Sequence, residues 1–345
     1  MLTCEWNSQE GWGQPKITPY QPLSLDPCSS ALHYATECFE GMKAYRNWST
    51  GEVRIFRPEL NAVRLNKSAA RVSLPSFDEQ EFVKVLQVLV GLEKRWLACK
   101  QDLEATSAST QEDEGDFIYI RPFLIGTGNT LGLSKPVEAL FVIVTSRMAR
   151  YNAQPLKLLA SSPAEMVRAW PAGFGNSKVG ANYGPSIQWQ GYAAQQGYDQ
   201  VLWLFDEDKK FVTEAGGANF FVVWRAGDKL ELVTAPMSSG TVLEGITRRS
   251  ILELARDRMP ELTVIEREFG VQEIIEAARE SRLLEAFLCG TAYFVAPVKT
   301  IGVDGQDISV PLQFGKSGEY AAKIKQWLME IMYGDCDHEW GIRVY

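Results

Sequence analysis

The order of strand-like and helix-like runs is the feature that most constrains the fold of this chain. In the second half, runs rich in β-branched and aromatic residues follow one another without strict alternation with helical runs. A doubly wound parallel sheet needs that alternation, and the sequence contains no GxGxxG and no Walker-type loop. We therefore expect an α+β fold with mixed or antiparallel sheets. Strands are predicted at 156–160, 200–205, 219–224, 230–234, 264–269 and 286–298, and helices at 185–196, 247–258, 271–279 and 319–333.

The length of 345 residues predicts two domains, because a single core rarely serves so long a chain. Before residue 146 we expect strands at 53–56, 117–125 and 138–145, and helices at 58–72 and 78–97. The polar, acidic stretch 101–116 is typical of a solvated surface loop. Since periodicity lapses between about residues 146 and 155, we predict domains at 1–147 and 156–345, joined by an interdomain loop at 148–155.

Composition excludes several classes of function. A formal net charge of −8 argues against a nucleic-acid-binding protein, and no apolar run is long enough for a membrane span. The first fifteen residues hold two glutamates and no basic side chain, so they do not resemble a secretion or transit signal. Six cysteines without CxxC spacing fit reduced thiols, and we expect a cytoplasmic protein. With only two histidines, we expect no metal site.

One lysine lies in a glycine-rich turn, Gly175-Asn-Ser-Lys178-Val-Gly-Ala-Asn-Tyr183-Gly184. Glycine lets the backbone approach a ligand closely, and a lysine shielded from water can become a nucleophile toward an aldehyde. Taken alone, such a stretch is more typical of a solvated loop with an exposed lysine.

Glu214 stands at a strand end before Gly216-Gly217. This pattern indicates either a plain hairpin with an exposed carboxylate or a carboxylate aimed at a protonated ring nitrogen. Residues 240–250 form a loop that enters a helix near Thr247. The junction suits a phosphate, although an ordinary threonine N-cap would give the same pattern.

Two more residues could bind an anion. Thr291, in Leu288-Cys-Gly-Thr-Ala292, is either part of a simple strand end or a phosphate ligand. Arg64 falls on the inward side of its helix, where an arginine needs an anion such as a phosphate or an internal carboxylate. Together these residues supply a lysine for an aldehyde, a tyrosine for a phenolic oxygen, a carboxylate for a pyridinium, and an arginine with threonines for a phosphate. That set matches pyridoxal 5′-phosphate group by group.

On these motifs the chain resembles the branched-chain amino acid aminotransferases, of the class IV (D-alanine aminotransferase-like) group of pyridoxal phosphate enzymes. Further matching motifs are 32–41, 56–58, 64–65, 119–122, 213–214, 244–248 and 290–292. The resemblance implies a two-domain α+β, fold-type IV enzyme. Its N-terminal α/β domain would be small, and its larger C-terminal domain would have a mixed, barrel-like sheet and bind the cofactor.

The resemblance also implies roles for individual residues. Lys178 would bind the cofactor aldehyde covalently and then carry the proton, Tyr183 would bond the phenolic oxygen, and Glu214 would hold the pyridine nitrogen protonated. The phosphate ligands would be Arg64, Ile246, Thr247 and Thr291. The substrate-binding residues would be Phe39, Tyr119, Arg121, Ala292 and, from the partner subunit of a homodimer, Tyr34.

The implied reaction is ping-pong transamination between branched-chain L-amino acids and 2-oxoglutarate, in amino-acid biosynthesis. It would yield branched-chain 2-oxo acids and L-glutamate. Ala181 and Glu244 depart from the family pattern, which usually has glycine and proline there. A second hypothesis is therefore a secondary-metabolic aminotransferase that acts on an unusual hydrophobic amino acid. A third is an aminodeoxychorismate lyase-like enzyme.

Overall fold

The computed structural model describes residues 1–97, 117–148 and 154–345. The predicted loop at 101–116 lies outside the described residues, as do residues 149–153 of the expected interdomain loop. Backbone contacts divide the chain into two compact units. The first comprises Met1–Asn152, Ser177–Ala181 and Met329–Tyr345, and the second Ala153–Asn176 and Asn182–Leu328. Compact units need not coincide with folding domains, so the domain limits 1–147 and 156–345 stay a prediction.

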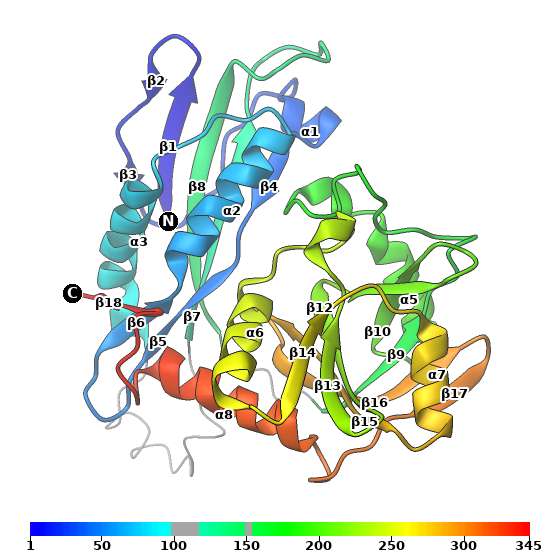
Figure 1. Cartoon of the computed structure of the whole chain (residues 1–345). Coiled ribbons are helices and arrows are strands. Elements are labelled where there is room, and N and C mark those ends of the chain that lie inside the picture. Colours follow the sequence, from blue (N-terminus) through cyan, green and yellow to red (C-terminus); the bar gives the residue numbers. More distant parts are fainter. Residues whose placement is uncertain (98–116, 149–153) are drawn as a thin grey trace. The chain divides into compact units, whose positions relative to one another are not determined.

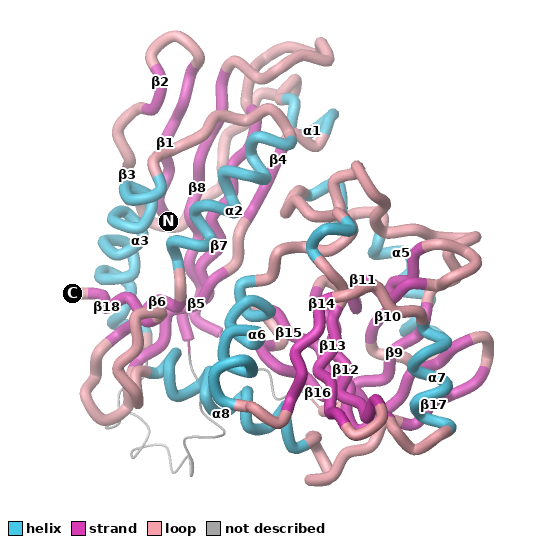
Figure 2. The backbone as a smooth tube through the Cα atoms, viewed as in Figure 1, coloured by secondary structure: helices cyan, strands magenta, loops and turns pink. Residues whose placement is uncertain are grey.

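The first unit is built on one antiparallel sheet (Figures 1 and 2). Its main path runs β18-β6-β5-β7-β8-β1-β2, with β3 paired to β1 and β4 paired to β7. The strands are β1 Leu2–Asn7, β2 Gly11–Trp12, β3 Lys16–Ile17, β4 Glu37–Phe39, β5 Met42–Arg46, β6 Val53–Phe56, β7 Phe117–Gly126, β8 Glu138–Met148 and β18 Gly341–Val344.

The two longer helices of this unit begin within a residue of where the sequence predicts. The helices are α1 Ser30–Tyr34, α2 Pro58–Arg71 and α3 Glu79–Glu93, followed by a 3-10 turn at Lys94–Trp96. Helix α3 starts after Asp78, whose carboxylate accepts hydrogen bonds from the backbone N–H groups of Gln80 and Glu81, both 2.9 Å long. Its apolar side is buried at Phe82, Leu86, Leu89 and Val90.

The second unit contains a barrel. Its strands are β9 Leu156–Ala160, β10 Gln200–Phe205, β11 Phe211–Ala215, β12 Ala218–Ala226, β13 Lys229–Thr234, β14 Leu262–Glu266, β15 Leu283–Gly290, β16 Phe294–Val303 and β17 Gln306–Ser309. Because β11 pairs with both β10 and β12, the path β11-β10-β9-β16-β15-β12 closes on itself. The expected barrel-like sheet is confirmed. The single strand predicted at 286–298 is wrong, since a turn at 291–293 separates β15 from β16.

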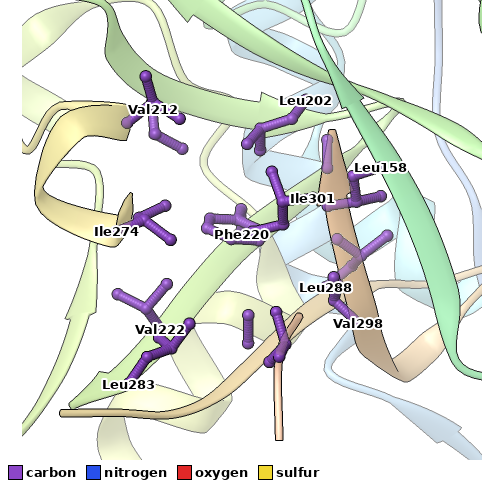
Figure 3. Close-up of a cluster of buried hydrophobic side chains, with 14 of the residues drawn as sticks. Leu158, Leu202, Val212, Phe220, Val222, Ile274, Leu283, Leu288, Val298 and Ile301 are labelled. Atoms are coloured by element: carbon purple, nitrogen blue, oxygen red, sulfur yellow. The ribbon is translucent and has the colours of Figure 1, made fainter. Parts of the chain in front are cut away.

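The barrel closes around a cluster of buried aliphatic and aromatic side chains, among them Leu202, Phe220 and Ile301 (Figure 3). The remaining helices of the chain are α5 Ser186–Gln195, α6 Ile246–Arg258, α7 Val271–Arg279 and α8 Glu319–Tyr333, with 3-10 turns at Gly180–Asn182 and Met237–Ser239. Helix α8 runs across the division between residues 328 and 329. Within the described ranges, no helix is long and apolar enough to span a membrane.

Candidate active site

The lysine turn is fixed to the first unit through its backbone. The N–H of Lys178 donates to Ser68 Oγ at 2.8 Å, and its carbonyl accepts from Phe39 N–H at 3.1 Å. The next residue, Val179, forms a β-bridge with Cys38. A side chain at Gly180 would have its Cβ 1.7 Å from Glu37 Oε1, so only glycine fits there without displacing Glu37. Lys178 is half-buried rather than fully exposed.

Three of the expected substrate-binding residues lie together with Lys178. Its Nζ is 4.7 Å from the centroid of the Phe39 ring, and Arg121 Cζ is 4.9 Å from the same centroid. Arg121 Nη2 also donates to the Tyr119 hydroxyl at 2.8 Å. Tyr119 and Arg121 are two apart on β7 and so share one face of the strand. The Arg121 guanidinium beside two aromatic rings can hold a carboxylate next to an apolar side chain.

Tyr34 has different neighbours. Its hydroxyl donates to the Leu131 carbonyl, and its side chain is exposed at the end of α1. Leu131 and Leu133 are exposed as well. Tyr34 therefore contacts the loop between β7 and β8 of its own chain, which carries Leu131 and Leu133.

Arg64 is buried with an internal carboxylate, which answers one question that the sequence left open. Its Nε donates to Glu40 Oε1 and its Nη2 to Glu40 Oε2, both at 2.7 Å. Asn61 Nδ2 also donates to Oε2 at 2.7 Å, and Glu40 is fully buried. Glu40 lies in a motif that the sequence singles out, yet no pattern had assigned it a function.

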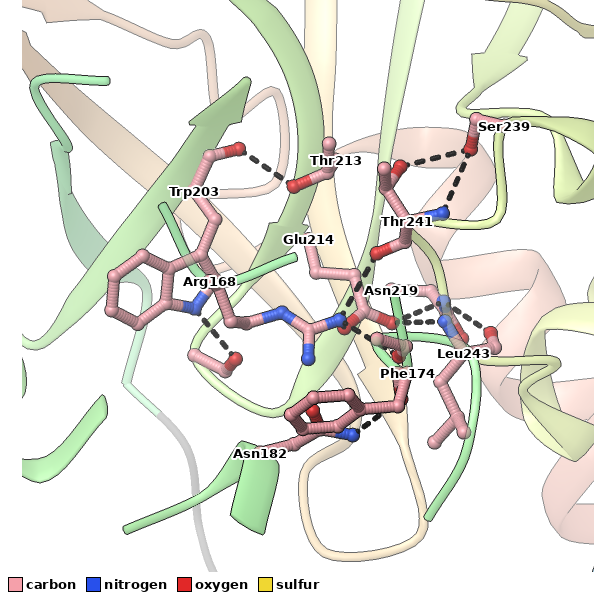
Figure 4. A network of polar contacts seen from close by, with 12 residues as sticks. Arg168, Phe174, Asn182, Trp203, Thr213, Glu214, Asn219, Ser239, Thr241 and Leu243 are labelled. Carbon is pink, nitrogen blue, oxygen red and sulfur yellow. Dashed lines mark hydrogen bonds and ion pairs between the residues drawn. The ribbon is translucent and has the colours of Figure 1, made fainter. Parts of the chain in front are cut away.

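Glu214 lies at the centre of a polar network in the second unit (Figure 4). Its Oε1 accepts from Asn219 Nδ2 and from the Leu243 N–H, each at 3.0 Å, and its Oε2 accepts from Arg168 Nη2. The predicted hairpin is confirmed, because β11 and β12 pair directly across the turn at 216–217. An exposed glutamate is wrong, since Glu214 is only 3% exposed.

Arg168 and Asn219 were missed in the sequence. Arg168 lies outside any helix or strand, 46 residues from Glu214, so neither periodicity nor spacing points to it. Asn219 is paired with Glu214 across the β11–β12 turn. Its position in that hairpin is a signal that could have found it.

The start of α6 has a glycine as its N-cap. Because the N-cap is Gly245, Thr247 lies in the first turn of the helix. The predicted threonine N-cap is therefore wrong. The amides of Ile246 and Thr247 lie at the positive end of the helix dipole, which suits a phosphate. A Cβ on Gly245 would be 1.9 Å from Asn219 Oδ1. This junction therefore packs against the residue that bonds Glu214.

Tyr183 and the turn at 291–293 lie near the β11–β12 turn. A Cβ on Gly217 would be 3.7 Å from Tyr183 Cε1, and one on Gly290 would be 3.6 Å from Ala218 Cβ. Thr291 is half-buried and Ala292 is exposed. Tyr183 and Gly290, the residue before Thr291, thus lie close to the hairpin that carries Glu214.

The buried thiols do not contribute a nucleophile. Burial raises the pKa of both Cys38 and Cys289, with nearby carboxylates adding to the effect at Cys38. Both thiols therefore stay protonated near neutral pH. The candidate nucleophile is the amine of Lys178.

Comparison with known proteins identifies the class. The sequence model of the family described as "Amino-transferase class IV" matches residues 37–301. The chain belongs to this family of class IV aminotransferases.

Individual relatives are narrower in function. The chain is 42% identical over 344 residues to the cytosolic branched-chain-amino-acid aminotransferase of Saccharomyces cerevisiae, covering 98% of this chain and 87% of that protein. It is also 42% identical to the mitochondrial enzyme of the same yeast, covering 97% and 82%. A crystal structure of the branched-chain amino acid aminotransferase from Thermobaculum terrenum in its PLP form aligns with a TM-score of 0.72 and 25% identity, covering 99% and 98%.

The chain is therefore a transaminase whose cofactor is pyridoxal 5′-phosphate. Two observations fit this cofactor. The buried carboxylate of Glu214 suits a protonated ring nitrogen, and the glycine-capped helix start at Gly245 suits a phosphate.

Proposed function

We propose that this chain transfers the amino group of leucine, isoleucine or valine to 2-oxoglutarate, giving the branched-chain 2-oxo acid and L-glutamate in two half-reactions. The observation that carries the proposal is the 42% identity to a branched-chain enzyme across 98% of the chain. Neither a secondary-metabolic aminotransferase nor an aminodeoxychorismate lyase gains support from the relatives described above. The departures at Ala181 and Glu244 alone do not outweigh that identity.

The cofactor, when bound, supplies an electron sink for the electrons released at the substrate Cα. Lys178 would anchor it and then move the proton at Cα, for which its half-buried position beside Phe39 is suited. Tyr183 would bond the phenolic oxygen. Glu214 would hold the proton on the ring nitrogen, because a buried carboxylate stabilises an adjacent cation.

Four residues would bind the phosphate. The amides of Ile246 and Thr247 offer donors at a helix start, and the Thr291 hydroxyl offers another. Arg64 would supply a guanidinium whose orientation is fixed by Glu40.

Substrate selection would follow from the residues that lie beside Lys178 in the first unit, namely Phe39, Tyr119 and Arg121. The rings of Phe39 and Tyr119 favour an aliphatic side chain, and burying a whole leucine side chain contributes about 1.5–3 kcal/mol. Arg121 and the amide of Ala292 would hold the α-carboxylate. We also propose a cytoplasmic homodimer in which Tyr34 lines the substrate pocket of the neighbouring subunit, a role consistent with the exposed Leu131 and Leu133 in the loop that it contacts.

An amino-donor screen with 2-oxoglutarate tests the proposal. Leucine, isoleucine and valine should give the highest kcat/KM, and Lys178→Ala should abolish turnover with all three. Turnover confined to other hydrophobic donors would favour the secondary-metabolic enzyme. Pyruvate release from aminodeoxychorismate without an acceptor would instead indicate the lyase.

A further inference from the structure

Arg168 joins three segments of the second unit through one nitrogen (Figure 4). Its Nη2 donates to Glu214 Oε2 and lies 3.3 Å from the Gly175 carbonyl and 3.2 Å from the Thr241 carbonyl. Gly175 lies three residues before Lys178, and Thr241 begins the loop that leads to α6. The guanidinium thus links the carboxylate to both flanking loops.

The pair is buried. The side chains of Arg168 and Glu214 are 7% and 4% exposed. Among the described residues, Arg168 Nε is also buried without a hydrogen-bond partner. Burying a guanidinium in this way is costly, and an ion pair of this kind often adds little stability over an apolar pair. Stability alone therefore does not account for this buried pair.

The positive charge of Arg168 also affects where a proton is held near Glu214. The Glu214 carboxylate and the pyridine nitrogen of the cofactor compete for one proton. Arg168 contacts the Glu214 carboxylate directly, so its charge stabilises the ionised form of that acid. Asn219 and the Leu243 N–H add two neutral donors to the other oxygen. Hydrogen bonds to the ionised form act in the same direction as the cation.

We propose that Arg168 is a positioning residue that keeps the shared proton on the ring nitrogen by holding Glu214 ionised and oriented. The inference rests on the proposed function. Without the guanidinium charge, the proton passes from the ring nitrogen to the Glu214 carboxylate, leaving a neutral acid beside a neutral pyridine. No other bond forms or breaks. The neutral ring is a weaker electron sink, so the loss falls on kcat rather than on KM.

The test measures the protonation of the ring nitrogen directly. Holoenzyme reconstituted with pyridoxal phosphate labelled with ¹⁵N in the ring is examined by NMR at neutral pH, as wild type and as two neutral variants, Arg168→Gln and Arg168→Met. Glutamine can still donate to the Gly175 or Thr241 carbonyl, so it separates charge from loop attachment. Arg168→Lys restores the charge. Arg248→Met is the matched control, because Arg248 is a buried arginine bonded to Glu266 and to the Ala235 carbonyl but not to Glu214.

We expect a protonated ring nitrogen in wild type, Arg168→Lys and Arg248→Met. In either neutral variant, the ratio of protonated to unprotonated ring should fall by about tenfold or more, since a contacting charge has effects of that order. If the one neutral variant fails to fold, the other gives the result. A ratio unchanged from wild type in a neutral variant with cofactor bound overturns the inference alone. A wild type that binds no cofactor at Lys178 overturns the proposed function and the inference together.

Discussion

Glu40 is fully buried and accepts two hydrogen bonds from the Arg64 guanidinium, each 2.7 Å long. Asn61 donates to the same carboxylate at 2.7 Å, and the Gly41 N–H does so at 3.2 Å. The charge of Arg64 is thus compensated within the first unit, and its orientation is fixed on α2.

Breaking this pair from one side should be expensive. Glu40→Leu and Arg64→Met each leave the other charge buried without its partner, so we expect each to lose about 3 kcal/mol in the free energy of unfolding. Replacing both partners by apolar residues, Glu40→Leu with Arg64→Met, should recover much of that loss. Urea unfolding of the cofactor-free protein measures the four members of the cycle. If the loss in the double variant equalled the sum of the losses in the two single variants, a direct interaction between Glu40 and Arg64 would be contradicted.

Gly245 offers a second test, against a control glycine. Alanine at 245 would place its Cβ 1.9 Å from Asn219 Oδ1, while Asn219 Nδ2 is held by Glu214 and by the Leu243 carbonyl. We expect Gly245→Ala to weaken cofactor binding by displacing Asn219. Gly191 lies in α5, where an added methyl group would meet nothing within 4 Å beyond its own helix, so Gly191→Ala should stabilise the protein by about 0.5–1 kcal/mol. Equal cofactor dissociation constants for the two variants would refute the proposed packing.

The cysteines should differ in reactivity. Since burial raises the pKa of Cys38 and Cys289, both should resist alkylation in the native protein. Among the cysteines that the structure describes, the half-buried Cys28 and Cys336 should react first. Peptide mapping after brief labelling checks this order, and labelling in urea serves as the control. Labelling of native Cys289 at the rate of Cys28 would show that β15 is more accessible than the structure indicates.

Glu285 predicts a pH dependence of stability. Burial raises the pKa of this carboxyl, although the backbone N–H groups of Ala321 and Tyr320 bond to it and partly offset the effect. Because the folded pKa lies above the unfolded one, the contribution to stability is fully present below the unfolded pKa and is lost as pH rises through the folded pKa. Glu285→Gln removes the titrating carboxyl and with it this pH-dependent contribution to stability. The difference in unfolding free energy between wild type and variant should therefore fall across that window, and a constant difference would contradict it.

The local elements follow from the sequence where one pattern dominates. The strands at 156–160 and 200–205 coincide with β9 and β10, because short β-branched and apolar runs have few alternatives. The segment 286–298 misleads because apolar residues continue on both sides of the turn at 291–293, although Gly290 and Thr291 are compatible with a strand end there. Helix α6 begins one residue early because glycine, rather than threonine, is its cap.

The candidate site is harder to predict because its pairs form only in the folded chain. Glu214 stands out through its hairpin, but its cation, Arg168, comes from an irregular segment 46 residues away. Arg64 signals a need for an anion, yet nothing in the spacing selects Glu40, 24 residues earlier, over a ligand phosphate. A charged residue expected in the interior indicates that it has a partner of opposite charge, but only the tertiary structure shows which residue that partner is.

The most direct test of the account is to reduce the holoenzyme with borohydride and map the modified peptide by mass spectrometry. We expect the reduced pyridoxyl group on Lys178, and no modified peptide from Lys178→Ala treated in the same way. A group attached to another lysine, or a wild-type protein that carries none, would contradict the central claim.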